Sequence, residues 1–504
     1  MSEHLPILQV VLPLLAAPLC VLLRQGGLVR WFASAVAWVT FAIAVVLLRA
    51  TLGGAELSYA IGDWAPPIGI EYRVNLPSAF VAAVVAAIAA VVLTFDSRGS
   101  ATRLAMRRRY LFYAAYLLCL AGLLGMAISG DAFNVFVFLE ISSLATYSLV
   151  SIGKERRALM SAFSYLIMGT LGGTFFLLGV GMLYVQTGTL NMADLAQRLD
   201  AVSGTRTVSL GFALIVIGLS IKLAVFPLHQ WLPNAYTYAP PKAAAFLAGT
   251  ATKVSYWVLV RFVFLVFGAS YAFDQMRLDL LLMPLSLLAM FVGALAAAYQ
   301  RDLRRLLAYS SISQVGYMTL GFSFANREGL TAGLVHMLNH GLAKSALFLA
   351  VACIAYRAGT TDISALRGIG RRMPFTSLAF VIGGMSLVGV PGTAGFITKW
   401  HLVLAAFDRG LPAVGFAVLL SSLLAVAYVW RLVETAYFSS GDDGGRAGGG
   451  SPGGEPRAAV LEAPLGMLLP MTVLMAATVV FGLWTRYSAG IAGDAAAFLL
   501  GVAP

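Results

Sequence analysis

Long hydrophobic runs separated by short polar loops dominate the 504-residue chain. The runs are about twenty residues long, the length that an α-helix needs to cross the hydrocarbon core of a membrane. Their apolar residues do not alternate with polar ones, as the strands of a membrane barrel would require. Threading the runs gives about fourteen spans. The pattern predicts an all-α polytopic membrane protein.

Composition and charge support this fold class. Hydrophobic residues make up 60% of the chain and charged residues 11%, whereas soluble domains are near half apolar and a quarter charged. A net charge of +12 would suggest nucleic acid in a soluble protein, but here the positive-inside rule accounts for it. The loops on one side of the threading, such as "GKERR", "QRDLRR" and "SRGSATRLAMRRR", hold most of the loop Lys and Arg. That side should be cytoplasmic, which places both termini outside a bacterial-type cell (inner) membrane.

The predicted spans group into repeated units. We expect N-terminal helices 1–3 in residues 1–109, a first repeat of helices 4–8 in 110–268, a second, inverted repeat of helices 9–13 in 269–438, a flexible cytoplasmic linker in 439–461, and helix 14 with the tail in 462–504. The linker prediction follows from "GDDGGRAGGGSPGG", which cannot bury apolar surface.

Lysines are confined almost entirely to the predicted spans. The chain has six lysines, and five of them lie in hydrophobic runs: Lys222, Lys242, Lys253, Lys344 and Lys399. An intramembrane charge costs roughly 2.5 kcal/mol or more on insertion scales, so such residues are usually functional. Arginine stays protonated, but a lysine in a low-dielectric site can exchange its proton near physiological pH. The pattern indicates protonation chemistry inside the membrane.

One acid and two histidines extend this pattern. Glu140 is the only carboxylate in the middle of a predicted span, and His336, His340 and Lys344 follow one another at four-residue spacing. Residues at this spacing lie close together on one side of a helix. A proton relay fits them better than a His/His metal site, because the lysine repels cations and no Cys or carboxylate cluster lies nearby.

Two predicted spans contain helix-breaking residues beside a lysine. Pro227 follows Lys222, and Pro391 with Gly392 precedes Lys399. Proline removes a helix hydrogen bond, and backbone freed in this way must be buried in protein or line a water-filled cavity. Broken helices in corresponding halves are typical of inverted repeats around a midplane ion path. We predict that helices 7 and 12 are broken.

Several motifs together resemble one family. "IKLAVFPLHQWLPNAY", "ATKVSYWVLVRF", "RRLLAYSSISQVGYMTLG", "HGLAKSALFL" and "GVPGTAGFITKW" resemble the proton-conducting antiporter-type membrane subunits. That superfamily includes the Mrp cation/proton antiporters and the antiporter-like subunits of respiratory complex I. The chain length, "GTLNMADLA" and the spacing in "HGLAK" look most like the D-type subunits of the Mrp antiporters.

The resemblance implies roles for particular residues. Glu140, Lys222, Lys253, His340 and Lys399 match the family's proton-translocation residues. Glu140 would tune the proton affinity of Lys222, and the proton would pass by Lys253 and His340 to Lys399. The auxiliary candidates are His336 and Lys344.

The sequence departs from the family at two positions. Ser164 stands where many members carry a lysine on helix 6, so a relay residue is missing or replaced by water. Lys242, beside prolines at a helix entrance, is interpreted as an interfacial lysine whose ammonium reaches toward the headgroups.

The sequence therefore predicts a proton-translocating subunit of a multisubunit Na+/proton antiporter. Its partners would be other membrane subunits, protons, a monovalent cation and the lipid bilayer, and no nucleic acid. We expect no catalytic residue, cofactor or metal, because the chain has no Gly-rich phosphate loop, Cys cluster or Ser/His/Asp arrangement.

Three alternatives stay open. The nearest is a proton-pumping membrane-arm subunit of a complex I-like NADH-quinone oxidoreductase or a membrane-bound hydrogenase complex. A scaffold with buried structural charges is another, although one Glu cannot neutralise several lysines. The third is an inorganic-carbon uptake subunit. The sequence does not specify the cation, the stoichiometry or the driving force.

Overall fold

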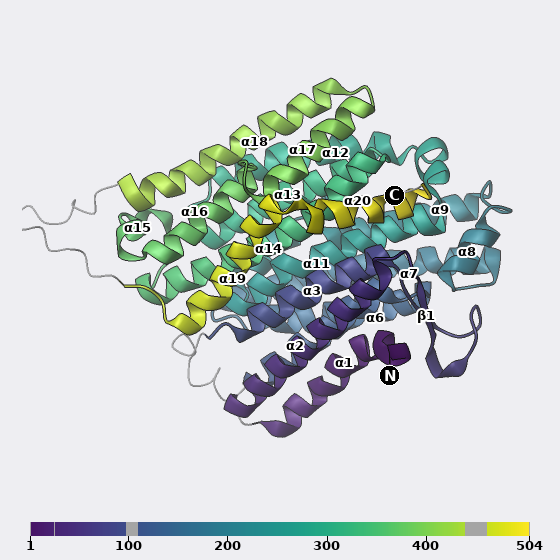
Figure 1. Cartoon of the computed structure of the whole chain (residues 1–504), viewed down its shortest axis with the longest axis horizontal. Helices are drawn as coiled ribbons and strands as arrows, with labels where there is room; N and C mark the ends of the chain where they lie inside the picture. The colour runs from purple at the N-terminus through teal and green to yellow at the C-terminus, as the bar shows by residue number, and fades with distance from the viewer. Residues whose placement is uncertain (1, 25, 97–108, 439–460, 503–504) are drawn as a thin grey trace, which may run out of the picture.

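The structure, a computed structural model, describes residues 2–24, 26–96, 109–438 and 461–502. Helices running side by side form nearly all of it (Figure 1). Twelve of the described helices are long and apolar enough to cross a membrane. The predicted helical membrane fold is thus confirmed. The count of fourteen spans stays a prediction, because α13 and the pair α16–α17 lie outside the twelve.

The elements follow the expected order along the chain. The N-terminal part holds α1 (Leu5–Leu23), α2 (Gly26–Thr51), β1 (Leu57–Ala60), β2 (Glu71–Val74) and α3 (Leu76–Thr94). The next group is α5 (Arg109–Ile128), α6 (Ala132–Ser151), α7 (Arg156–Thr187), α8 (Met192–Leu199), α9 (Arg206–Leu223), α10 (Trp231–Tyr238) and α11 (Pro241–Arg261).

A third group, similar in its helix lengths, comes after it. It comprises α12 (Leu278–Ala298), α13 (Leu303–Ser323), α14 (Arg327–Ala358), α15 (Ile369–Arg372), α16 (Pro374–Val388), α17 (Ala394–Asp408) and α18 (Pro412–Val433), and α19 (Leu465–Leu483) and α20 (Ala489–Leu500) end the chain. Short 3₁₀ or π turns are η1 (Ser2–His4), η2 (Ile61–Asp63), η4 (Phe262–Val266), η5 (Tyr271–Gln275), η6 (Ile363–Leu366), η7 (Glu434–Phe438) and η8 (Thr485–Tyr487).

The two middle groups share features that support the predicted repeats. Each contains a 32-residue helix, α7 or α14. In each, a β-bridge joins the N-cap of the preceding helix to the segment that follows the long helix: Asp131 to Asn191, and Asp302 to Asp362. Figure 1 shows α8 and α15, which follow the two long helices, at opposite ends of the bundle. Such opposition is what an inverted repeat requires.

Both predicted broken helices are present. α9 ends at Leu223, and Ala224 adopts a left-handed conformation with φ of 63°. Pro227 lies in the connection, and helix resumes at Trp231. α16 ends at Val388, where Gly389 caps it with φ of 86°, and α17 begins after Pro391 and Gly392. A left-handed residue at this position is a common helix stop, and glycine adopts it without steric cost. The break after α9 therefore falls at Ala224, before Pro227, and not at the proline itself.

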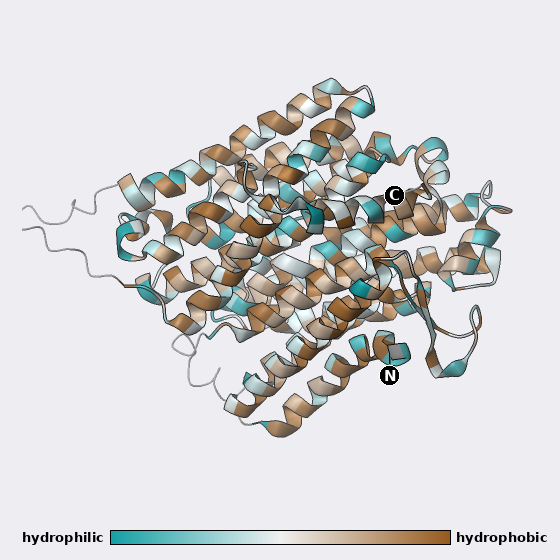
Figure 2. Ribbon diagram, viewed as in Figure 1, coloured by the Kyte–Doolittle hydropathy of each residue, from teal (hydrophilic) through white to brown (hydrophobic). Residues whose placement is uncertain are grey.

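Burial separates central helices from outer ones. α14 contacts α3, α11, α13, α16, α17, α19 and α20, and its span is completely buried, while those of α3 and α11 are nearly so. In the outer helices α1, α2, α7, α12, α18 and α19, less than half of each span is buried. Figure 2 shows hydrophobic residues along these helices and hydrophilic residues gathered at the two ends of the bundle. Apolar surface in this position suits contact with lipid.

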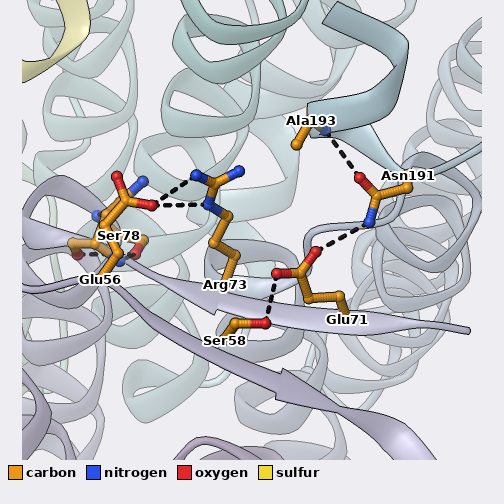
Figure 3. Close-up of polar contacts among 8 residues, drawn as sticks. Glu56, Ser58, Glu71, Arg73, Ser78, Asn191 and Ala193 are labelled. Atoms are coloured by element: carbon orange, nitrogen blue, oxygen red, sulfur yellow. Dashed lines mark hydrogen bonds and ion pairs between the residues drawn. The ribbon is translucent and has the colours of Figure 1, made fainter. Parts of the chain in front are cut away.

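A polar cluster fastens the β1–β2 hairpin to one end of the bundle (Figure 3). Glu71 accepts hydrogen bonds from Ser58 at 2.7 Å and Asn191 at 2.9 Å, and Arg73 pairs with Glu56 at 2.6 Å. The adjoining pocket, of about 410 Å³, is lined by these residues. Because the buried Glu71 carboxylate already accepts hydrogen bonds from Ser58 and Asn191, we interpret the cluster as a structural link between the hairpin and the start of α8.

Both chain termini lie toward the end of the bundle that carries β1 and α8 (Figure 1). Their common end agrees with an even number of crossings. Residues 97–108 of the basic loop and 439–460 of the expected linker lie outside the described residues. The flexible linker and the outward orientation of the termini therefore stay predictions.

Candidate functional site

Lys222 lies in a polar site between α9 and α6. Its ammonium Nζ donates to the Ser143 hydroxyl at 2.7 Å and lies 3.5 Å from both Glu140 Oε1 and the Tyr147 hydroxyl. The three partners are on one face of α6, because they follow at spacings of three and four residues. Among the lysines within the described helices, Lys222 alone has a carboxylate within ion-pair distance.

Two glycines on α7 leave room for this site. A Cβ on Gly173 would lie 2.2 Å from Glu140 Oε1, and a Cβ on Gly169 would nearly coincide with the Tyr147 hydroxyl. Any other residue would displace these polar groups, since real Cβ contacts are longer than 3.0 Å. The glycines of α7 are thus part of the site's construction, and sequence reasoning did not identify them.

The ion pair is unevenly buried. The Lys222 side chain is 6% exposed, whereas that of Glu140 is 26% exposed. Glu140 therefore reaches the outer surface near α7, while Lys222 is enclosed in protein. A group outside this chain can contact the carboxylate and change its pairing with the lysine.

Two further buried lysines lie on the central helices α11 and α14. Lys253 donates to the Ala248 carbonyl and to the Thr252 hydroxyl, and Lys344 donates to the Leu307 carbonyl at 2.8 Å and to the Ser310 hydroxyl. Lys253 interacts electrostatically with His336, His340 and Lys344. These lysines have neutral oxygen acceptors, so losing a proton leaves no buried anion beside them.

His336 and His340 connect the lysines along α14. Their rings stack at 5.4 Å, and the ring nitrogens of both have no hydrogen-bond partner in the described part of the chain. Both residues are buried. A buried polar atom left unsatisfied costs about 1–3 kcal/mol, so the free nitrogens favour a hydrated path. Asn339, between them in sequence, instead fastens α14 to α17 by donating to the Ala394 carbonyl at 2.5 Å.

Lys399 lies at the second helix break. Its ammonium donates to the Leu387 carbonyl at 3.1 Å and the Val388 carbonyl at 2.5 Å, at the C-terminal end of α16. The carbonyl end of a helix carries partial negative charge and favours a cation. The Tyr317 ring lies 4.9 Å from Lys399 Nζ and 5.9 Å from the His336 ring, so it stands between the two.

The structure places both residues at which the sequence departs from the family, and the interpretation of Lys242 needs correction. Lys242 is buried, and its ammonium donates to the Leu93 carbonyl at 3.3 Å and lies 5.5 Å from the Tyr113 ring. It therefore remains near the end of α11, but inside protein rather than toward headgroups. Ser164 is exposed on the outer face of α7, whereas its neighbour Tyr165 is buried and stacks on Trp231 at 4.0 Å. A relay residue at position 164 would face away from the path.

The structure thus brings Glu140 and Lys222 together. Separately it groups Lys253, His336, His340 and Lys344, which we name the central group, and places Lys399 beside this group across Tyr317. The passage of a proton from Lys222 to Lys253 stays a prediction. Sequence reasoning missed Ser143, Tyr147 and Tyr317, whose type and helical spacing were visible but whose partners come from other helices. No group of three His, Cys, Asp or Glu side chains in the described ranges could hold a metal ion.

Buried lysines, histidines and one carboxylate between two broken helices define a polytopic membrane protein of the ion-translocating class. Residues 129–425 match the transmembrane family of NADH:quinone oxidoreductase and Mrp antiporter proteins, and the chain belongs to this family.

Two curated relatives and one solved structure illustrate which proteins the chain is similar to. The N-type subunit of the NADH-quinone oxidoreductase of Desulforudis audaxviator is 40% identical and aligns over 96% of this chain and 97% of its own. The D-type subunit of the Na(+)/H(+) antiporter of Alkalihalophilus pseudofirmus is 32% identical over 73% of this chain and 74% of its own. A chain of the Mrp complex from Dietzia sp. DQ12-45-1b, 27% identical, superposes with a TM-score of 0.88 over 99% of this chain and 97% of that chain.

Proposed function

We propose that this chain is the proton-translocating subunit of a multisubunit Na+/H+ antiporter in a bacterial cell membrane. The observation that carries the proposal is the Lys222 site, where a buried ammonium lies 3.5 Å from a partly exposed carboxylate, that of Glu140. A change in the position or charge of Glu140 alters the proton affinity of Lys222, because the two charges interact strongly in a low-dielectric site.

The proton then moves through the central group toward the second break. Lys222 releases its proton toward Lys253, the histidines of α14 pass it on, and Lys399 receives it at the end of α16. No covalent chemistry is required of the protein. Other membrane subunits complete the antiporter, as the Mrp complex of the structural relative is built from several chains.

A second candidate rests on the 40% identical relative named as a subunit of NADH-quinone oxidoreductase. In that case the same residues pump protons, and a redox reaction in other subunits supplies the energy. Purification of the native complex separates the candidates. Antiporter subunits together with Na+/H+ exchange in proteoliposomes support the first, and quinone-reducing subunits with proton pumping that requires an electron donor support the second.

The role of the Lys222 site is tested by substitution within the assembled complex. Lys222→Ala and Glu140→Ala should abolish proton translocation while the complex still assembles. Lys222→Arg should fail as well, because a guanidinium does not release its proton. Lys154→Ala is the matched control, since Lys154 is exposed outside the path. Normal translocation by Lys222→Ala would overturn the proposal.

A further inference from the structure

A hydrogen-bonded His–Glu pair outside the predicted path joins the N-terminal end of α14 to α17. His401 Nδ1 lies 2.6 Å from Glu328 Oε2, and the two side chains are 21% and 33% exposed. Asn326, the N-cap of α14, makes a second link by donating to the Ala405 carbonyl of α17 at 3.1 Å. The pair is therefore supported by a second contact between the two helices and is partly exposed.

The position of Glu328 on α14 connects it with the central group. Glu328 is two four-residue steps before His336, and His340 and Lys344 continue the series. Residues at this spacing form a ridge that winds slowly along a helix. Glu328 is in the first turn of α14, so it is the outermost polar member of a ridge whose inner members are buried.

α17 supplies the second connection. His401 follows Lys399 by two residues, a rise of about 3 Å along α17 and a turn of about 200° around it, so the two side chains leave the helix on different sides. Lys399 in turn adjoins Tyr317 and, beyond it, His336. The pair thus joins the N-terminal end of α14 to the middle of α17, the two helices that carry the path.

We propose that the Glu328–His401 pair exchanges protons between Lys399 and the aqueous surface at this end of the bundle. The proposal rests on the proposed translocation of protons through Lys222 and Lys399. A proton leaves the Lys399 ammonium and reaches neutral His401 through water, since the two side chains do not face each other. The imidazolium gives its Nδ1 proton to the Glu328 carboxylate, and the carboxylic acid releases it to water. Lys399 is left neutral and takes the next proton from the central group, and the reverse sequence serves uptake.

Histidine and glutamate suit this task because both act as general acids and bases in proteins. The pairing keeps the net charge of the site constant while a proton passes between its members. A merely structural ion pair would tie α14 to α17 without affecting proton exchange, so the test must separate the two roles.

The experiment compares Glu328→Gln and His401→Gln in the assembled complex with Asp408→Asn, which removes an exposed carboxylate from the same helix. Each glutamine can keep a hydrogen bond between α14 and α17 but cannot pass a proton. We expect each to slow proton translocation by about tenfold or more, with an unchanged melting temperature. Asp408→Asn should translocate at the wild-type rate.

A rescue measurement completes the test. The smaller variant His401→Gly should translocate slowly and recover when imidazole is added, because free imidazole replaces the lost proton carrier. Wild-type rates in both glutamine variants would overturn the proposal, and so would slowed rates with a lowered melting temperature and no response to imidazole. Lys222→Ala is measured in parallel: if it translocates normally, the proposed function fails, whereas an inactive Lys222→Ala beside active glutamine variants refutes only the exchange pair.

Discussion

Gly173 gives the sharpest test of the Lys222 site. In Gly173→Ala, the new Cβ would lie 2.2 Å from Glu140 Oε1, so the carboxylate must retreat by about 1 Å before the separation exceeds the 3.0 Å below which real Cβ contacts essentially never fall. If the whole retreat adds to the Lys222–Glu140 distance of 3.5 Å, that distance becomes about 4.5 Å. At an effective dielectric constant of about 20, the attraction weakens by about 1 kcal/mol. Such a loss changes the protonation equilibrium of the pair roughly sixfold.

Gly181→Ala is the matched control on the same helix, because a Cβ there meets nothing within 4 Å. Both variants gain helix propensity, by about 1 kcal/mol, so both should assemble normally. The assay is Na+-driven proton movement in everted vesicles, followed with a pH-sensitive dye. We expect Gly181→Ala to match the wild type and Gly173→Ala to translocate several times more slowly. Equal rates in the two variants would refute the idea that the position of Glu140 controls Lys222.

Two further predictions concern Lys399 and the stability of the bundle. Gly389→Ala and Gly392→Ala both place alanine at φ of 86°, and each should lose about 1–2 kcal/mol of stability. Only the new Cβ of Gly389→Ala also meets Lys399, at 2.6 Å from its Cδ. Translocation assays should therefore show slower transport for Gly389→Ala than for Gly392→Ala, and equal rates would contradict this reasoning. Arg261 is buried and donates to the Met126 carbonyl at 3.1 Å and the Ser129 carbonyl at 2.5 Å, so Arg261→Leu should lower the free energy of unfolding by about 3 kcal/mol. Thermal melting in detergent would measure the loss, with Arg198→Leu, at an exposed ion pair, as the near-neutral comparison.

The sequence was sufficient for the fold class because lipid-spanning helices must be long and apolar. It was also sufficient for both helix breaks and for the pairing of Glu140 with Lys222, the latter through the family resemblance. These inferences depend on chemistry that is visible at single positions, such as a lysine or a proline inside a hydrophobic run.

Features that depend on contacts between helices were missed. The need for Gly173 appears only when α7 lies against α6, and Glu328 and His401 are far apart in sequence. The outward position of Ser164 could not be predicted from the sequence either. A step of one residue turns a helix by about 100°, so Ser164 is exposed while the adjacent Tyr165 is buried. The buried position of Lys242 depends on Leu93 and Tyr113, which no local pattern identifies.

The two breaks hold their lysines against different kinds of negative charge. Lys399 faces the carbonyl end of α16, a permanent dipole that stays balanced by its own helix after the proton departs. Lys222 faces Glu140, and a departing proton would leave a whole negative charge unneutralised in low dielectric, which is costly. Under the proposed function, the Lys222 site therefore needs a replacement cation once its proton has left, whereas the Lys399 site can stay neutral between protons. Of these two lysine sites, the Lys222 site is thus the one at which the departure of one ion is linked to the arrival of another.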